Sequence, residues 1–369
     1  MTSSELYPVS RLAAVQEATA KSGIDALLLT PGPDLRYVTG YDAKPLERLT
    51  CLVVPAAGEP YMMVPRLELP AAQASPASRL GLEFVAWDET DDPYRIAAAR
   101  LGRPGVVGLA DRMWAMSSLR FRDVLPGAEQ VLAGGVLGEL RKRKSPAEVA
   151  ALREAGEAID AVHRQVPGFL RAGRTEREVA RDIVEAILAA GHDTVDFVIV
   201  GSGPNGASPH HEVSDRVIQA GEPVVVDIGG QLHNGYCSDS TRTYSVGEPP
   251  ADFAAYYEVL RRAQDAACAA VRPGVPCESI DAAARDLIAE AGFGDHFIHR
   301  TGHGIGIETH EEPYIVAGNA EPMEPGFAFS VEPGIYLAGR HGARIEDIVV
   351  CGESGGERLN NTSRELVIV

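Results

Sequence analysis

The chain has 369 residues, of which 45% are hydrophobic and 23% charged, a composition that predicts a globular protein of two or three domains. Its formal net charge of −18 at pH 7 would repel phosphate groups, so we expect neither a nucleic acid nor an anionic membrane as a partner. The five scattered cysteines contain no CxxC pair, and no apolar run is long enough to span a membrane, which disfavours a disulfide framework, a zinc ribbon and a membrane protein. The first residues lack the pattern of a signal peptide, and we expect a cytoplasmic protein.

The N-terminal part of the chain alternates short apolar runs with helical patterns. Strand-like runs lie at 25–30, 50–54 and 61–64, and helix-like segments lie near 10–22 and 93–101. This alternation predicts a small α/β domain. It contains few clustered His, Asp or Glu residues, so we do not expect the reaction centre there.

A change of composition separates this part from the rest of the chain. The segment 141–146 is basic and polar and differs from both of its flanks. We therefore expect a first domain at 1–135 and a second domain at 136–369. A solvated helix face inside a single domain is the alternative interpretation of such a run.

A helical unit recurs in the second part of the chain. The pattern over 146–169 predicts one long helix, and another helix begins after Thr175, where Glu178 completes a capping-box spacing. The segments 173–191 and 274–292 share a Gly start, an apolar stripe and an Ala-Gly end at an offset of 101 residues. We interpret them as a duplicated α-then-β half, although two unrelated amphipathic helices would give the same pattern. A duplication would place a crevice between the halves, which is a natural place for a site.

Two glycine-rich loops look like phosphate-binding motifs and are rejected as such. The segment Gly201–Gly206 matches G-x-G-x-x-G, but Pro204 and Pro209 interrupt the helix that such a motif needs to hold a pyrophosphate. The segment 301–306 is too short for a phosphate loop and lacks its Gly-Lys-Ser/Thr ending. We expect both to be loops in which glycine lets the backbone turn tightly.

Carboxylates inside apolar, strand-like runs are the most informative feature of the sequence. Asp227, Glu332 and Glu346 each lie in such a run, although Asp and Glu are depleted in strands. Burying an unpaired ionised carboxylate costs several kcal/mol at least, so a positive group should meet each of them. For each residue alone, a half-exposed or salt-bridged strand acid is the alternative interpretation.

Two predicted hairpins would bring four acids to one place. The first hairpin carries Asp227 and Asp239, and the second carries Glu332 and Glu346. Since Arg242 and Arg344 are the few basic residues nearby, we expect two divalent metal ions to neutralise the acids. His303 is the best nitrogen candidate, although a single loop histidine is more often merely hydrogen-bonded. An oxygen-rich set with one imidazole favours manganese or cobalt over a structural zinc.

At this point the residues are similar to a known family, the pita-bread metallopeptidases, and within it to the Xaa-Pro dipeptidase (prolidase) and aminopeptidase P branch. The resemblance implies an α/β (α+β) fold, with a creatinase-type N-terminal α/β domain and a C-terminal pita-bread domain that has an internal pseudo-twofold repeat. In the N-terminal domain, 35–41 is the clearest matching piece. The second domain carries five matching blocks in order: Val226-Asp-Ile-Gly229, Tyr236-Cys-Ser-Asp-Ser-Thr-Arg-Thr243, Thr301-Gly-His-Gly-Ile-Gly-Ile-Glu-Thr-His-Glu-Glu-Pro313, Val331-Glu-Pro-Gly-Ile-Tyr336 and Arg344-Ile-Glu-Asp347.

The resemblance also implies the residues of a dinuclear centre. It implies Asp239 and Glu346 as ligands that bridge two divalent ions, with manganese expected and cobalt or zinc as alternatives. The remaining implied ligands are Asp227, His303 and Glu332.

Four residues are expected to act in catalysis. The resemblance implies that His210 and His310 face the substrate, and we prefer His210 to the adjoining His211 because it follows Pro209 directly. Arg344 lies two residues before Glu346, so strand alternation puts both on one face, where the arginine would orient the acid ligands. Glu332 is expected to carry a proton. A loop histidine in solvent and a surface salt bridge are the alternatives for His210 and Arg344.

The reaction implied by the resemblance is hydrolysis of the bond between an N-terminal residue and proline. The expected substrate is a small peptide with proline in the second position, and the expected assembly is a homodimer. An Xaa-Pro dipeptidase is the preferred interpretation; an Xaa-Pro aminopeptidase and a same-fold hydrolase or lyase of a small non-peptide compound are alternatives. A dipeptidase needs a cation for the proline carboxylate, and 311–331 contains no Arg or Lys, which leaves Arg340 or a residue of the N-terminal domain.

Overall fold

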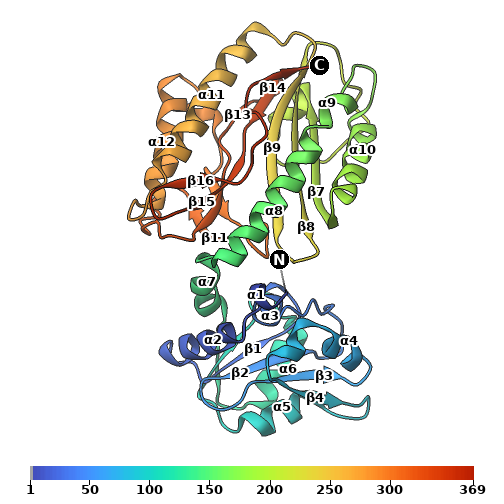
Figure 1. Cartoon of the computed structure of the whole chain (residues 1–369), viewed down its shortest axis with the longest axis vertical. Helices are drawn as coiled ribbons and strands as arrows, with labels where there is room; N and C mark the ends of the chain where they lie inside the picture. The colour runs from blue at the N-terminus through green and yellow to red at the C-terminus, as the bar shows by residue number, and fades with distance from the viewer. Residues whose placement is uncertain (1–2) are drawn as a thin grey trace. The chain divides into compact units, whose positions relative to one another are not determined.

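The computed structural model describes residues 3–369, and its contacts divide the chain into two compact units. The first unit ends at Arg141 and the second begins at Lys142 (Figure 1). Helix α7 (Gly134–Lys142) runs across the position 135/136, where the sequence predicted the boundary between the two domains. That domain boundary stays a prediction. In the described part of the chain, no helix is long and apolar enough to cross a membrane.

The N-terminal unit is an α/β domain built on one six-stranded sheet. Its helices are α1 (Ser3–Leu6), α2 (Val9–Lys21), α3 (Pro33–Thr39), α4 (Leu69–Ala74), α5 (Pro93–Leu101) and α6 (Ala115–Val124), with a 3-10 turn η1 (Pro76–Arg79). Its strands are β1 (Ala26–Leu29), β2 (Cys51–Pro55), β3 (Tyr61–Pro65), β4 (Glu83–Trp87), β5 (Val106–Leu109) and β6 (Glu129–Leu132). They lie in the order β4-β3-β2-β1-β5-β6, and β2 alone of these six is antiparallel to its neighbours. The predicted strands and helices of this part are confirmed to within two residues.

The C-terminal unit consists of two halves, each with helices and strands. The first half contains α8 (Pro146–His163), α9 (Val166–Phe169), α10 (Glu176–Ala189), β7 (His192–Ser202), the 3-10 turn η2 (Gly203–Ala207), β8 (Glu222–Leu232) and β9 (Cys237–Val246). The second half contains α11 (Ala251–Ala270), α12 (Cys277–Glu290), the 3-10 turn η3 (Gly294–His296), β10 (Gly302–Gly304), β11 (Glu311–Ile315), β12 (Ala328–Val331), β13 (Gly334–Leu337), β14 (His341–Arg344), β15 (Asp347–Cys351), β16 (Gly356–Arg358) and β17 (Val367–Ile368). The sheets have the orders β17-β9-β8-β7 and β11-β10-β12-β15-β16, and β13 and β14 form a hairpin.

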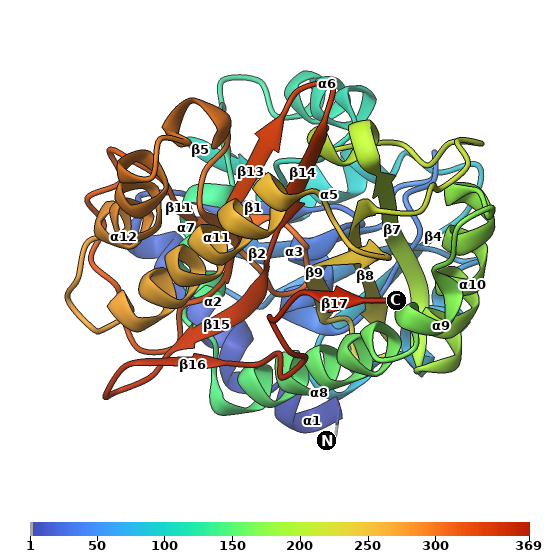
Figure 2. The same ribbon diagram turned by 90° about the horizontal axis from the view of Figure 1, so that it is seen from above.

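The predicted duplication is confirmed by the matching pair of helices. Helices α10 and α12 have 14 residues each, and they lie on opposite outer sides of the strands of this unit (Figures 1 and 2). Ile183 of α10 and Ala284 of α12 are fully buried, each in the hydrophobic core of its own half. The strands therefore lie between two separately cored layers of helices, and their inner faces are left to form a site.

The helical pattern over 146–169 breaks where one long helix was expected. Helix α8 begins at a capping box of Ser145 and Glu148 and ends at His163, and the short helix α9 follows. Pro167 explains the break, because a proline inside a helix removes a hydrogen bond and clashes with the carbonyl four residues earlier. The capping box predicted at Thr175 and Glu178 is present, with Glu178 N donating to Thr175 Oγ1 over 3.2 Å.

Candidate metal centre

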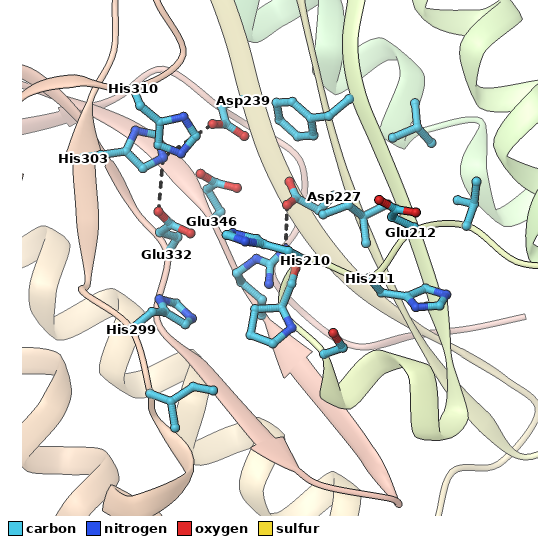
Figure 3. Close-up of a pocket in the computed structure, with 18 of the residues that line it drawn as sticks. His210, His211, Glu212, Asp227, Asp239, His299, His303, His310, Glu332 and Glu346 are labelled. Atoms are coloured by element: carbon cyan, nitrogen blue, oxygen red, sulfur yellow. Dashed lines mark hydrogen bonds and ion pairs between the residues drawn. The ribbon is translucent and has the colours of Figure 1, made fainter.

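One large pocket lies in the C-terminal unit and contains every residue predicted for the site. Its volume is about 1150 Å³, which is room enough for a small peptide. Phe197, Ile199 and Ile298 form part of its apolar wall. The predicted residues that line it are His210, Asp227, Asp239, His303, His310, Glu332, Arg344 and Glu346 (Figure 3).

Strand alternation places the two aspartates on one face of the β8–β9 hairpin. Asp227 pairs with Thr241 and Gly229 pairs with Asp239, so the two acids are diagonal neighbours. The residues on either side of Asp227, Val226 and Ile228, point the other way into the hydrophobic core that α8 and α10 cover. The apolar residues of the run therefore bury one face of the strand, and Asp227 in the middle of the run points from the opposite face into the pocket. The predicted hairpin is confirmed.

The two glutamates flank the second hairpin, as predicted. Glu332 lies between β12 and β13, Glu346 lies between β14 and β15, and Gly334 pairs with Arg344 at the base of the hairpin. Glu346 is held by Thr241, whose hydroxyl donates to Glu346 Oε2 over 2.7 Å. This bond joins the second hairpin to the first at the site.

His303 enters this group of acids from β10. Its Nδ1 lies 3.1 Å from the carbonyl oxygen of Gly304, which can only accept, so Nδ1 donates there and Nε2 is the ring nitrogen that faces the acids. Nε2 lies 3.2 Å from Glu332 and 3.7 Å from Asp239. Ligand atoms of Asp239, His303 and Glu346 lie within 4.8 Å of one another and could hold a metal ion.

Burial and mutual repulsion shift the pKa values of the carboxyl groups. Burial, and then the charge of Glu346, raise the pKa of Asp239 well above its usual value. Burial, and then the charges of Glu332 and Asp227, do the same to Glu346. Glu332 differs: burial by itself raises its pKa, but the hydrogen bond and charge of His303, together with the charges of His299 and Arg344, lower it to about 2. Two of these acids thus disfavour ionisation unless a cation lies among them.

Arg344 orients Asp227 but leaves one of its oxygens without a partner. Its guanidinium donates to Asp227 Oδ2 over 2.5 Å and to the Tyr336 hydroxyl over 2.8 Å. Oδ1 of Asp227 is buried and has no hydrogen-bond partner within residues 3–369. A buried carboxylate oxygen is costly in that state, and it is suitably placed to bind a cation. The same arginine also donates to the carbonyl of Pro209, next to His210, over 3.3 Å.

The two histidines predicted to face the substrate lie at the pocket wall. The ring of His310 lies 4.0 Å from that of His303, and partial burial with the charge of His303 lowers its pKa to about 4. His310 is therefore neutral at pH 7 and carries one N–H. His210 and His211 also line the pocket, but His211 Nε2 lies 2.8 Å from the buried Glu176 and is engaged there. This geometry supports the preference for His210.

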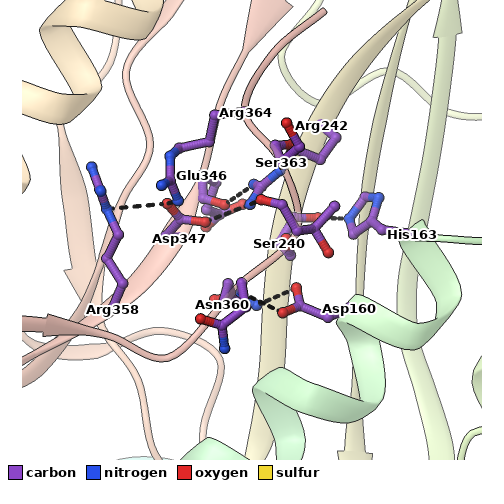
Figure 4. Close-up of polar contacts among 12 residues, drawn as sticks. Asp160, His163, Ser240, Arg242, Glu346, Asp347, Arg358, Asn360, Ser363 and Arg364 are labelled. Carbon is purple, nitrogen blue, oxygen red and sulfur yellow. Dashed lines mark hydrogen bonds and ion pairs between the residues drawn. The ribbon is translucent and has the colours of Figure 1, made fainter. Parts of the chain in front are cut away.

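Strand alternation separates Arg242 from the site. Arg242 is on the opposite face of β9 from Asp239, and Asp347 is on the opposite face from Glu346. The two form a fully buried ion pair of 2.6 Å, while Arg364 donates to the other oxygen of Asp347 (Figure 4). Of the two basic residues expected to lie near the acids, only Arg344 contributes its side chain to the pocket lining.

Two residues that support the site, Glu176 and His299, were not found from the sequence. Glu176 accepts hydrogen bonds from Ser202 and Ser214 and so fastens the loop that carries His210. His299 lines the pocket with its Nε2 2.9 Å from the Tyr336 hydroxyl. A glutamate in the first turn of a helix and a histidine in a loop are both common in sequences, so neither residue gave a local signal. A buried set of carboxylates and an imidazole in such a pocket defines the site of a metal-dependent enzyme.

Comparison with known proteins agrees with this class. The model of metallopeptidase family M24 matches residues 150–353, and the model of the creatinase/prolidase N-terminal domain matches residues 11–143. The chain belongs to metallopeptidase family M24. The predicted pita-bread domain with a creatinase-type N-terminal domain is thus confirmed.

The similar proteins match nearly the whole chain. A probable dipeptidase PepE of Mycobacterium tuberculosis is 55% identical over 366 residues, which cover 99% of this chain and 97% of the relative. The crystal structure of dipeptidase PepE from Mycobacterium ulcerans has a TM-score of 0.93 at 55% identity and covers 98% of this chain and 97% of that chain. A prolidase from Thermococcus sibiricus has a TM-score of 0.91 at 38% identity and covers 97% of this chain and 98% of that chain. Membership of family M24 confirms the predicted enzyme class, a metallopeptidase that uses divalent metal.

Proposed function

We propose that this protein is an Xaa-Pro dipeptidase that hydrolyses its substrate with two divalent metal ions. The observation that carries the proposal is the meeting of four carboxylates, three of them buried and that of Glu332 partly buried, with one imidazole in a peptide-sized pocket. The names of the similar proteins, dipeptidase PepE and prolidase, support the same substrate class.

The donor set fits divalent metal ions. The unpartnered Oδ1 of Asp227 and the raised pKa values of Asp239 and Glu346 all indicate a cation among these groups. We assign Asp227, Asp239, His303, Glu332 and Glu346 as the ligands. Oxygen-rich ligation favours manganese, with cobalt or zinc as alternatives. A homodimer in the cytoplasm is part of the same proposal.

The chemistry follows from what each side chain can hold or donate. Bound divalent ions would polarise the scissile carbonyl and lower the pKa of the attacking water. Glu332, ionised at neutral pH, accepts a proton from that water and passes it to the departing proline nitrogen. His310 or His210 donates an N–H to the oxyanion that develops on the carbonyl oxygen. Arg344 keeps Asp227 in position throughout.

A bond to proline suits this kind of site. The amide nitrogen before proline has no hydrogen, so a peptidase that must bind a scissile N–H cannot use it. The groups of this pocket act on the carbonyl oxygen and the leaving nitrogen and need no such hydrogen. The apolar wall of Phe197, Ile199 and Ile298 offers the prolyl ring a surface to pack against.

The experiment measures proline released from Ala-Pro and Gly-Pro, with Ala-Leu as the control dipeptide, before and after chelation and after manganese is restored. His303→Ala is expected to lose bound metal and activity together, whereas His233→Ala is the matched control because His233 is 94% exposed. Full turnover after exhaustive chelation would refute the metal-dependent reaction. No cleavage of any Xaa-Pro dipeptide would favour a small non-peptide substrate instead.

Two further measurements test the preference for dipeptides and the proton transfer by Glu332 separately. A peptide such as Ala-Pro-Ala tests the aminopeptidase alternative, because a dipeptidase is expected to cleave it far more slowly than Ala-Pro. Glu332→Gln, with its metal content verified, tests the proton transfer. Unchanged turnover in that variant would show that another group carries the proton.

A further inference from the structure

The pocket contains one arginine that has no acidic partner. Three arginines line it, and two are engaged: Arg344 with Asp227, and Arg177 with Asp215 over 2.7 Å. Arg300 forms no ion pair or side-chain hydrogen bond within residues 3–369, although it carries a full charge at the pocket wall. It is therefore the pocket arginine left to meet a ligand.

Arg300 is positioned by packing rather than by an acid. It lies three residues before His303, and His303 pairs across the strands with Tyr314. The guanidinium lies over the Tyr314 ring, 4.3 Å from its centroid. A cation held over a ring face does not use its N–H groups in that contact, so they stay available to form two parallel hydrogen bonds with a carboxylate. Arg300 thus lines the same pocket as the acids of the candidate metal centre and is paired with none of them.

A dipeptide brings a charge that the acidic site does not otherwise accommodate. Its free carboxylate lies directly on the residue after the scissile bond, and five carboxylates already line this pocket, those of Glu212, Asp227, Asp239, Glu332 and Glu346. A longer peptide has an uncharged amide at that place. Arg340, suggested by the sequence, does not serve because it is paired with Asp252 and is not among the residues that line the pocket.

We propose that Arg300 binds the C-terminal carboxylate of the substrate and so selects dipeptides over longer peptides. This inference rests on the proposed function and deepens it. The test compares Ala-Pro with its C-terminal amide, Ala-Pro-NH₂, which differs only in that charge. Arg300→Gln removes the cation, Arg300→Lys keeps it, and Arg177→Gln removes the paired arginine of the same pocket.

The expected result is a change in the ratio of the two kcat/KM values, not a general loss. Arg300→Gln is expected to lower kcat/KM for Ala-Pro about 10- to 100-fold, mostly through KM, and to change the value for Ala-Pro-NH₂ less than about threefold. Arg300→Lys is expected to retain part of the preference, and Arg177→Gln to leave the ratio unchanged.

Two results would overturn the assignment. Equal losses on both substrates in Arg300→Gln would make the arginine structural, and an unchanged preference for Ala-Pro would assign the carboxylate to another group. Both are distinct from failure of the proposed function, in which the wild-type protein with manganese would cleave neither substrate.

Discussion

The carboxylate of Glu176 fastens the loop of His210, and its replacement by glutamine tests that role. The Glu176 side chain is fully buried. Its Oε1 accepts from the backbone N–H and hydroxyl of Ser202 over 2.8 Å each, and its Oε2 accepts from the backbone N–H of Ser214 over 3.3 Å and from its hydroxyl over 2.6 Å. Glu176→Gln keeps the size of the side chain but turns one of the two acceptors into a donor.

The cost follows from the direction of these bonds. The Ser202 and Ser214 hydroxyls can rotate to accept from the new amide, but their backbone N–H groups cannot. Whichever way the amide points, one backbone donor therefore faces another donor. The loss of a hydrogen bond to a charged acceptor costs about 1.5–3 kcal/mol, and the buried donor left over adds to it, so we expect about 2–4 kcal/mol in the unfolding free energy.

The assay is urea unfolding followed by far-UV circular dichroism. Tryptophan fluorescence is unsuitable because Trp87 and Trp114 both belong to the N-terminal unit. With about 1–3 kcal/mol per molar urea, the midpoint of the C-terminal unit is expected to fall by about 0.7 M or more. Activity on Ala-Pro should fall as well, since the His210 loop loses its anchor.

A matched control lies in the same turn of α10. Glu178 is exposed and accepts from the Thr175 backbone N–H over 2.8 Å. Glu178→Gln leaves a capping box intact, because glutamine serves at that position as well as glutamate, and no shift is expected. If Glu176→Gln unfolded at the same urea concentration as Glu178→Gln, the anchoring role would be refuted.

Two further predictions concern the polar groups behind the metal centre. Asp347→Asn is expected to lower the unfolding free energy by about 3–5 kcal/mol, because it leaves the buried Arg242 without its charged partner; a loss in urea unfolding no larger than that of exposed Glu365→Gln would contradict this. Burial lowers the pKa of His163 to about 3, so its protonation favours the unfolded chain, and stability should fall by about 1.4 kcal/mol per unit as the pH drops from about 6.5 towards 3. His163→Gln removes this contribution, and its stability relative to the wild type should rise with acidification; parallel pH profiles would argue against it.

The sequence determined the elements and the set of acids, because both are written in local patterns. The capping box at Thr175 and the alternation around Asp227 are each readable within a few residues. Burying an unpaired carboxylate among apolar strand residues costs so much free energy that a cation is expected beside it, whatever the position of the strand in the fold. The break at Pro167 was equally local, and it was missed because the apolar periodicity continues across it.

Only the tertiary structure decided which cations meet which acids. Arg242 and Arg344 look alike in the sequence, but register and strand direction turn Arg242 to Asp347 and Arg344 to Asp227. The guanidinium of Arg300 is positioned by the ring of Tyr314 on the neighbouring strand, and no spacing in the sequence specifies that contact. These choices depend on pairings between residues far apart in the chain, and such pairings are fixed by packing rather than by local pattern.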